Sequence, residues 1–407
     1  MRVVVVHNRY SSRVPSGENL AVDDEVTWLR DAGVDVVRHE VSNDQMIAPG
    51  PLGRARDGVE ATWSVSARRR FVADLDAHRP DLVHVHNLFP LLTGSVPVAA
   101  RRRRIPVVWT VHNHRIRCVA GGNFRDGAPC HDCRPGWRAP GIVHRCYAGS
   151  VAASGLTTAA SSLFRVSARR RGVTPIAISE DVARWLRHEG GFGDTDVQVK
   201  YNGVAGPIAP PTPPVANRSF LFLGRLGAYK GVGLLLDAWR RADVDATLRI
   251  VGDGDMAATV REAAAADARI TWDGQVPPSA IGRLIDAARV VVVPSTWHEP
   301  FGRTAAEALA YGRPVITTGR GALSEIVDGS TGWVTGLEPD AMAAAIVEAA
   351  ASPETVQRRG AAAAARHQHT FSPTATTEAL LRIYEHARRD VSDRRMDVTG
   401  RSGHRPG

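Results

Sequence analysis

Two glutamates are the residues whose type and spacing most suggest chemistry. Glu299 follows an apolar run at 288–293, and Glu307 lies eight positions later, inside the helix predicted at 303–310. Gly302 stands between them, where the lack of a side chain lets the backbone approach a ligand at a helix start. Carboxylates placed there accept hydrogen bonds from sugar and ribose hydroxyls. Taken alone, Glu299 is better explained as a solvated charge near a helix N-terminus.

A glycine, an arginine and a lysine form the second such group. A predicted strand at 220–223 ends at Gly224, Arg225 follows it, and Lys230 comes just before a helix predicted at 231–241. This order would gather backbone N–H groups and two cations around a diphosphate, although a surface turn is the usual explanation of a lone Gly-Arg. Lys230 strengthens the hypothesis because only two of the 51 basic residues are lysines. A compact ammonium serves as a point charge between phosphate oxygens, where a guanidinium fits less well.

Four cysteines within 29 residues form a third cluster, in a long loop over residues 113–147. They are Cys118, Cys130, Cys133 and Cys146. A C-x2-C pair with two flanking cysteines could bind structural zinc tetrahedrally, but flanking spacings of 11 and 12 residues are not those of paired zinc knuckles. Reduced cysteines in a loop core and a disulfide are the alternatives.

Short apolar runs alternate with helix-patterned segments along the chain, which is typical of parallel α/β architecture. The sequence predicts strands at 3–6, 34–37, 81–86, 106–111, 175–179, 220–223, 247–251, 288–293 and 314–317. Five prolines in the nine residues 206–214 indicate a stiff linker. We therefore expect two doubly wound, Rossmann-like domains at 1–204 and 217–370, joined by a linker at 205–216. A cleft between them would hold the ligand, because such sheets bind at the carboxyl ends of their strands.

The chain end and the charge complete the predicted organisation. A helix at 371–387 is expected to pack back on the first domain, and residues 388–407 are expected to be disordered. The net charge is +9, of which residues 1–200 carry +8, with arginine clusters at 68–70, 101–104 and 169–171. Each cluster follows a predicted helix, so it either complements that helix's dipole or offers a basic face to an anionic membrane. Aromatic interleaving and nucleic-acid motifs are absent from the sequence, so no nucleic-acid partner is expected.

The N-terminal apolar run is too short for a signal peptide and is predicted to be a buried strand. The longest uncharged stretch, 146–164, contains too many glycines, serines and threonines to cross a bilayer unaided. The expected location is cytoplasmic, with peripheral contact at the inner membrane face as a further hypothesis.

Together these segments resemble the retaining glycosyltransferases of family four, which have the two-domain GT-B fold. The pair Glu299-x7-Glu307 resembles the family's paired-glutamate signature, and the segment from Gly224 to Lys230 resembles its diphosphate clamp. Three further segments follow the family's order along most of the chain: 201–204, 248–254 and 312–332. The resemblance implies a donor that is a nucleotide diphosphate sugar, and it implies no obligatory metal or other cofactor for catalysis.

The resemblance also assigns roles to individual residues. Arg225 and Lys230 would hold the diphosphate and stabilise it as the leaving group. Glu307 would bind the ribose hydroxyls and Glu299 the sugar hydroxyls. Further donor contacts would come from Gly224, from the backbone of Phe301, Gly302 and Arg303, and from the segment that carries Glu325.

In the first domain, the resemblance places His112 near the reacting sugar, and it matches Gly17 to a glycine that lets its loop approach donor phosphate and acceptor. Four more histidines flank predicted strand ends in this half, and at least one should be purely structural: His7, His84, His86 and His114. Many relatives with a similar His-Asn-x-Arg-x-x-Cys segment carry these cysteines, which leaves the zinc question open.

The predicted function is transfer of a hexose-type sugar, with retention of configuration, from a nucleotide diphosphate sugar to a hydroxyl acceptor. That acceptor could belong to a polysaccharide, a lipid-linked glycan or a natural product. Two alternatives remain. The first is a GT-B sugar-nucleotide epimerase, against which the two paired motifs argue. The second is a non-catalytic basic module that binds membrane or nucleic acid.

Overall fold

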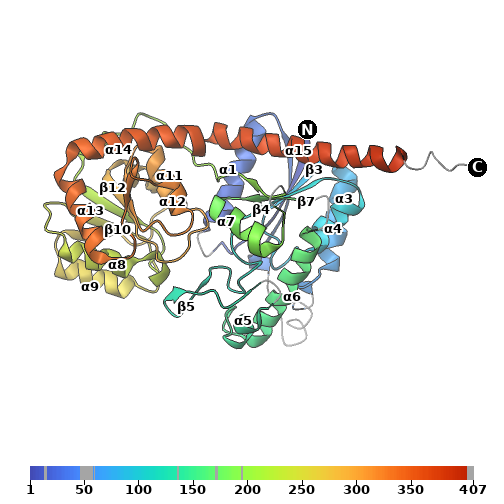
Figure 1. Ribbon diagram of the computed structural model, residues 1–407, viewed down its shortest axis with the longest axis horizontal. Coiled ribbons are helices and arrows are strands. Elements are labelled where there is room, and N and C mark those ends of the chain that lie inside the picture. Colours follow the sequence, from blue (N-terminus) through green and yellow to red (C-terminus); the bar gives the residue numbers. More distant parts are fainter. Residues whose placement is uncertain are drawn as a thin grey trace, which may run out of the picture. The chain divides into compact units, whose positions relative to one another are not determined.

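The structure, a computed structural model, describes residues 1–12, 16–45, 58, 60–134, 137–169, 173–193 and 196–400, with side chains up to residue 390. It divides into two compact units (Figure 1). Unit 1 contains Met1–Gly122, His131–Tyr201 and the chain from Thr376 onward, and unit 2 contains Asn123–Cys130 and Asn202–Ala375. The sequence places the first boundary at residue 204, close to this division. It does not predict that 123–130, inside the cysteine loop, group with unit 2.

Unit 1 is built on a six-stranded parallel sheet with the order β2-β1-β3-β4-β7-β8. Its strands are β1 (Arg2–Arg9), β2 (Asp35–Ser42), β3 (Leu82–Val85), β4 (Val107–Val111), β7 (Val173–Ala177) and β8 (Gln198–Val199). The chain runs from β1 to β2 on one side and then returns to β3 on the other side of β1. Such a reversal leaves a crevice at the carboxyl ends of the two strands, where α/β sheets bind ligands.

Four of the helices of unit 1 begin at serine caps. The Oγ atoms of Ser16, Ser64, Ser150 and Ser179 each accept a hydrogen bond from the backbone N–H three residues later. The helices are α1 (Gly17–Asp31), α3 (Val65–His78), α4 (Ser95–Arg102), α5 (Ala139–Val143), α6 (Val151–Ala168), α7 (Glu180–Trp185) and α15 (Pro373–Gly400), with short turns at Asn43–Gln45 and Leu186–Gly190. Among the described helices, none has the length and apolar character needed to cross a lipid bilayer.

The arginine clusters differ in their positions. The cluster at 101–104 lies at the end of α4, as the sequence predicts. Residues 68–70, in contrast, lie inside α3, because Ala67, Phe71 and Leu75 form a buried stripe with four-residue spacing that runs past them. Arg169 caps the end of α6, whereas residues 170 and 171 lie outside the described residues.

The C-terminal helix α15 contributes directly to the core of unit 1. Leu380, Ile383 and Tyr384 are buried among strand residues such as Val3 and Leu82. The helix continues to Gly400, where the sequence predicts a disordered tail from residue 388. The lack of an apolar stripe beyond that point argues against packing, but arginine-rich sequence still favours helix. Residues 401–407 lie outside the described residues.

A side-chain hydrogen bond joins this helix to the sheet, and it gives the first prediction. The Tyr384 hydroxyl lies 2.7 Å from Nδ1 of His84 on β3, and both side chains are fully buried. Tyr384→Phe should lower the free energy of unfolding by about 1–2 kcal/mol, because it leaves a buried ring nitrogen without this partner. Urea unfolding measures the loss. Tyr147→Phe, which keeps its ring contact with Phe89, is the control. An equal effect of both changes would contradict a specific role for the hydroxyl.

Unit 2 has a second six-stranded parallel sheet, with the order β11-β10-β9-β12-β13-β14. Its strands are β9 (Ser219–Leu223), β10 (Thr247–Val251), β11 (Ile270–Trp272), β12 (Ala288–Val293), β13 (Val315–Thr317) and β14 (Gly332–Val334). The reversal of strand order here falls between β9 and β12. The loops that follow these two strands carry Gly224, Arg225, Lys230 and Glu299, which the sequence singles out in its second half.

The helices of unit 2 pack around a core that contains Phe220, Trp239 and Ile346. They are α8 (Val232–Arg241), α9 (Ala257–Ala266), α10 (Pro278–Asp286), α11 (Arg303–Ala310), α12 (Leu323–Ile326), α13 (Pro339–Ala351) and α14 (Pro353–Arg366), with short turns at Pro214–Ala216, Ala228–Lys230 and His367–Phe371. A small hairpin of β5 (Phe124–Arg125) and β6 (Ala128–Pro129) also belongs to this unit.

Candidate active site

Two loops at the carboxyl edge of the unit 2 sheet form one framework. The loop after β9 and the loop after β12 are joined by hydrogen bonds, since the backbone N–H of Thr296 donates to the Tyr229 carbonyl at 3.0 Å. The Thr296 hydroxyl also donates to the Ala228 carbonyl at 3.2 Å. Adjacent parallel strands therefore bring together two sequence motifs that are about seventy residues apart.

Lys230 and Glu299 meet within this framework. The ammonium Nζ of Lys230 donates to Oε1 of Glu299 at 2.5 Å, and the Ser295 hydroxyl donates to the same oxygen at 2.7 Å. The Glu299 side chain is only 6% exposed, whereas that of Lys230 is 26% exposed. One carboxylate oxygen is thus held from two sides, and the lysine keeps an open face toward solvent.

The electrostatics favour a charged pair. Burial alone would raise the pKa of Glu299, but the charge of the Lys230 ammonium and the hydrogen bonds that the carboxylate accepts hold that pKa below its ordinary value. The rings of Tyr229 and Trp297 also flank the ammonium, with centroids 5.6 and 5.3 Å from Nζ. The arrangement keeps a cation and an anion in fixed positions at the carboxyl edge of the unit 2 sheet.

Glycines let the surrounding backbone segments approach closely. Gly302, the N-cap of α11, has a φ of +91°, a conformation that favours glycine. Gly321 pairs with Glu299 across a parallel bridge, and a Cβ at Gly321 would lie 2.5 Å from the Glu299 carbonyl oxygen. The position of Glu299 therefore depends on a backbone contact as well as on its side-chain partners.

Gly224 and Arg225 begin the loop after β9. The backbone N–H of Gly224 donates to the Val251 carbonyl at 3.0 Å, which ties the loop to β10. The Arg225 side chain is exposed. A cation on a fixed backbone with a solvent-facing side chain suits an anionic ligand that arrives from outside.

The remaining donor-site candidates lie on α11 and α12. Arg303 Nε donates to Oε1 of Glu307 at 2.8 Å, one helical turn away, and both side chains are mostly buried. Phe301 is buried against Phe371, so only its backbone is available to a ligand. Glu325 lies on α12, where its carbonyl accepts a hydrogen bond from Arg366 at 2.6 Å.

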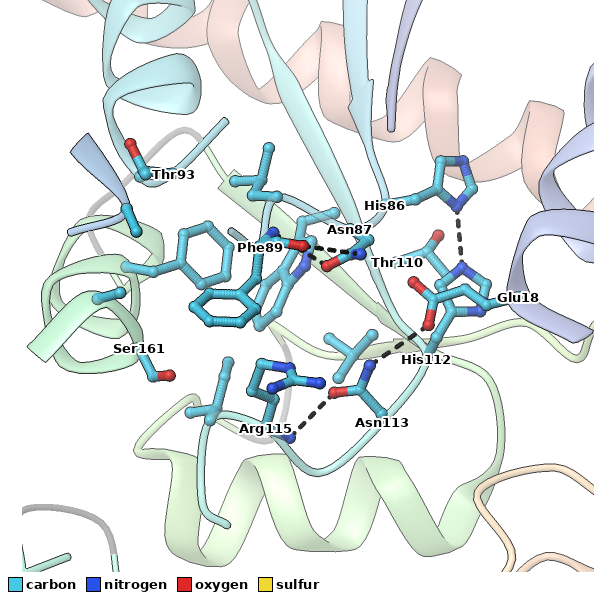
Figure 2. A pocket seen from close by; sticks show the side chains of 18 residues that line it. Glu18, His86, Asn87, Phe89, Thr93, Thr110, His112, Asn113, Arg115 and Ser161 are labelled. Atoms are coloured by element: carbon cyan, nitrogen blue, oxygen red, sulfur yellow. Dashed lines mark hydrogen bonds between the residues drawn. The ribbon is translucent and has the colours of Figure 1, made fainter. Parts of the chain in front are cut away.

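Unit 1 contains a pocket of its own at the carboxyl edge of its sheet (Figure 2). Apolar side chains such as Trp109 and Phe164 form part of its wall, and polar side chains gather at one end. Those polar side chains include Glu18, His86, His112, Asn113 and Arg115.

His112, the sequence-predicted catalytic histidine, directly follows β4 and lines this pocket. Its Nε2 lies 2.9 Å from Nδ1 of His86, and the two rings stack with centroids 5.3 Å apart (Figure 2). Burial and the neighbouring His86 lower the pKa of His112 well below its ordinary value, so the ring is neutral at pH 7. Gly17, at the start of α1, has no atom within 4 Å of the position a Cβ would take.

Glu18 and its partners are functional candidates that sequence reasoning missed. Oε2 of Glu18 accepts hydrogen bonds from the Asn113 amide at 3.3 Å and from the Tyr10 hydroxyl at 3.2 Å. Burial raises the pKa of Glu18, against the opposing effect of the Arg115 guanidinium. A usable signal existed in the sequence, because Glu18 adjoins Gly17 and Asn113 and Arg115 follow His112.

Two of the other histidines, His84 and His7, are buried and have side-chain hydrogen-bond partners. His84 is fully buried, with Nε2 2.7 Å from the Thr110 hydroxyl and Nδ1 2.7 Å from that of Tyr384, so it is the structural histidine expected among them. His7 Nε2 lies 2.9 Å from Oδ1 of Asn19, and burial lowers the pKa of His7 to about 3.

The four cysteines, all of them among the described residues, do not form a metal site in this structure. Within the described part of the chain, no three of the four Sγ atoms lie within 4.8 Å of one another. All four residues carry thiols, and Cys133 is buried. The residues present therefore do not fit the zinc hypothesis.

Comparison with known proteins identifies the family. Residues 21–205 match the Glycosyltransferase Family 4 profile, and residues 217–352 match the profile of Glycosyl transferases group 1. Glycogen synthase of Mycobacterium tuberculosis is 27% identical over 401 residues, covering 93% of this chain and 86% of the relative. The 2-deoxystreptamine glucosyltransferase of Streptomyces kanamyceticus is 29% identical, covering 76% of this chain and 79% of the relative.

Solved structures agree on the fold. Anabaena HepE in complex with UDP superposes with a TM-score of 0.66 at 17% identity, covering 95% of this chain and 100% of the other. Sucrose-phosphate synthase of Thermosynechococcus elongatus gives a TM-score of 0.66 at 18% identity, covering 95% and 98%. The family profiles and the glycosyltransferase relatives place the protein among glycosyltransferases rather than epimerases or basic binding modules. The chain belongs to the family 4, group 1 glycosyltransferases, and its two parallel α/β units are the Rossmann-like domains of the GT-B fold.

Proposed function

We propose that this glycosyltransferase moves a hexose-type sugar, with retention of anomeric configuration, from a nucleotide diphosphate sugar to a hydroxyl acceptor. The contact between Lys230 and Glu299 carries the proposal, because it sets a cation for phosphate beside a carboxylate for sugar hydroxyls. Similar solved structures that contain UDP and UDP-glucose support a nucleotide sugar as the donor.

The proposed reaction assigns a task to three charged groups of unit 2. Glu299 accepts hydrogen bonds from sugar hydroxyls and so fixes the ring, while Lys230 and Arg225 bind the diphosphate. The bond between the anomeric carbon and the phosphate oxygen breaks, and its electron pair leaves with the diphosphate, which the two cations stabilise. The acceptor oxygen bonds to the same face of the oxocarbenium-like carbon, and its proton passes to a phosphate oxygen.

Two measurements test this function. A thermal-shift panel of UDP-, GDP-, ADP- and TDP-sugars should show stabilisation by one nucleotide class, because a bound ligand stabilises the folded state by mass action. NMR of the product formed with the selected donor should then show the donor's anomeric configuration. An inverted product would overturn the retaining mechanism, and an epimerised nucleotide sugar formed without acceptor would overturn the transferase reaction.

Glu307 provides a further prediction about donor binding. Glu307→Ala should weaken binding of the selected nucleoside diphosphate by about tenfold, because it removes a charged acceptor for the ribose hydroxyls. Calorimetry measures the change. Glu262→Ala, on the exposed face of α9, is the control. The weakening should shrink when the ligand lacks its ribose hydroxyls, and an undiminished loss would contradict the ribose contact.

A further inference from the structure

Lys200, the other of the chain's two lysines, is buried in unit 1. Its ammonium contacts the carboxylate of Glu25 on α1, and the two side chains are 3% and 9% exposed. A buried ion pair adds little to stability on balance, because desolvation offsets the attraction. Stability alone is therefore a weak explanation of this pair, and its neighbours suggest a second one.

Glu25 connects the lysine to the pocket. Its Oε1 lies 3.3 Å from Nε2 of His86, a charge contact whose two atoms have no hydrogen-bond partner among the described residues, and the other ring nitrogen of His86 is hydrogen-bonded to Nε2 of His112 at 2.9 Å. Four side chains thus form a row of contacts from Lys200 through Glu25 and His86 to His112, which lines the pocket. Figure 2 shows the last two members of this row, His86 and His112. Its members come from β8, α1, β3 and β4, and three of them directly follow the ends of their strands.

A metal ion is the first alternative for such a group. Glu25, His84 and His86 offer ligand atoms within 4.8 Å of one another. The Lys200 ammonium, however, already neutralises the carboxylate and would repel a second cation. Both nitrogens of His84 are also engaged, by Thr110 and Tyr384. The row is better suited to ordering protons than to holding a metal.

The charge of Glu25 decides where the protons lie. Burial would raise its pKa, but Lys200 and the adjacent histidines together hold that pKa well below its ordinary value. An ionised carboxylate can only accept, so Nε2 of His86 carries the proton that faces it. When that is the only proton on the His86 ring, its Nδ1 is a lone pair, and the 2.9 Å hydrogen bond to Nε2 of His112 needs the proton of His112. That leaves Nδ1 of His112 unprotonated.

We propose that Lys200, Glu25 and His86 are positioning residues that fix His112 as the neutral tautomer with its proton on Nε2. The remaining ring nitrogen, Nδ1, then accepts a hydrogen bond from a hydroxyl of the sugar or of the acceptor. This inference rests on the proposed function and deepens it, because it states which nitrogen of His112 meets the substrate and why.

The wild-type protein offers a direct test. In histidine-labelled protein, 15N NMR distinguishes a protonated from an unprotonated ring nitrogen, and the spectrum of His112→Gln identifies the signals of residue 112. We expect His112 to carry its proton on Nε2. A proton on Nδ1 would overturn the proposal. This measurement needs no turnover, so it tests the positioning role of Lys200, Glu25 and His86 separately from the proposed function.

Lys200→Met tests the origin of the order. Without the ammonium, the buried Glu25 becomes a neutral carboxyl group, which donates a hydrogen bond to Nε2 of His86. The His86 proton then lies on Nδ1 and is donated to Nε2 of His112. The proton of His112 therefore moves to its Nδ1, which becomes a donor. We expect the 15N signals of His112 to show a protonated Nδ1 and an unprotonated Nε2, the reverse of the wild type. kcat/KM should fall by about 10- to 100-fold, the range found when an outer partner of a ligating histidine is removed. Unchanged His112 signals would overturn the proposal that the row positions His112.

A double variant separates positioning from stability. Lys200→Met with Glu25→Leu removes both charges, which should restore most of the folding stability lost by Lys200→Met alone. If the row positions His112, kcat/KM stays low in the stable double variant; recovery of kcat/KM together with stability would overturn the proposal. Asp74→Asn is the control for a changed carboxylate partner of a buried histidine outside the row, since Asp74 Oδ2 lies 2.5 Å from Nδ1 of His39, and it should leave kcat/KM unchanged.

Discussion

Lys230→Ala should lower kcat/KM by about 1,000-fold, the largest effect on turnover that we expect from a single change. An electrostatic donor aimed at charge that develops in the transition state contributes about 3–4 kcal/mol, and Lys230 is a partly buried cation that contacts Glu299 in the unit 2 site. The same change should weaken binding of the nucleoside diphosphate, measured by calorimetry. An unchanged affinity would remove Lys230 from the diphosphate clamp.

Removal of Lys230 has a side effect that the experiment must separate. Glu299 would lose the ammonium that lowers its pKa, so burial would raise that pKa and favour the protonated carboxyl. The double variant Lys230→Ala with Glu299→Gln removes the unpaired carboxylate. If Lys230 binds phosphate directly, the double variant still binds the diphosphate weakly. If affinity returns, the loss arises from Glu299 instead.

Two further variants define what the lysine supplies. Arg241→Ala removes a cation from an exposed ion pair with Asp340 in the same unit, and it should leave nucleotide affinity unchanged. Lys230→Arg keeps the charge but replaces a compact ammonium with a planar fork. It should recover only part of the activity, because the larger guanidinium cannot reproduce the single-point contact that the ammonium makes with Oε1 of Glu299.

The unit 2 site was predictable because local signals and topology agree there. Glycines and charged residues directly follow two apolar runs, and parallel strands present their carboxyl ends at one edge. The strand order then places β9 beside β12, which brings Lys230 to Glu299 across 69 positions of sequence. The sequence predicts each residue and the strand that it follows. The contact between Lys230 and Glu299 depends in addition on the order of the strands in the sheet.

The row in unit 1 was not predictable in the same way. Lys200 and Glu25 are 175 positions apart, and Glu25 lies within a helix whose pattern marks it as one more polar residue. Their contact arises only when α1 packs on the sheet. The Tyr384 hydroxyl likewise reaches His84 from 300 positions away, through a helix whose packing, but not its length, follows from apolar periodicity. Long-range polar contacts leave no local signature in a single sequence.

Gly231→Ala should destabilise unit 2 by about 3–4 kcal/mol, the largest loss of folding stability that we expect from one added methyl group. Gly231 has a φ of +74°, and a Cβ there would lie 1.8 Å from the Pro294 carbonyl oxygen. The left-handed backbone alone costs a non-glycine residue about 1–2 kcal/mol. The clash is with backbone rather than with a flexible side chain, so it is relieved only if a segment moves.

A second glycine isolates the contribution of that contact. Gly274 has a φ of +66° but no atom within 4 Å of the position that a Cβ would take, so Gly274→Ala should show the backbone cost alone. Urea unfolding of the two variants gives the difference, and equal losses would contradict the close contact. Because Gly231 follows Lys230 and Pro294 begins the loop that carries Glu299, relief of the clash must separate the two charges. Gly231→Ala should therefore also lose nucleotide affinity in its folded form, whereas Gly274→Ala should keep it.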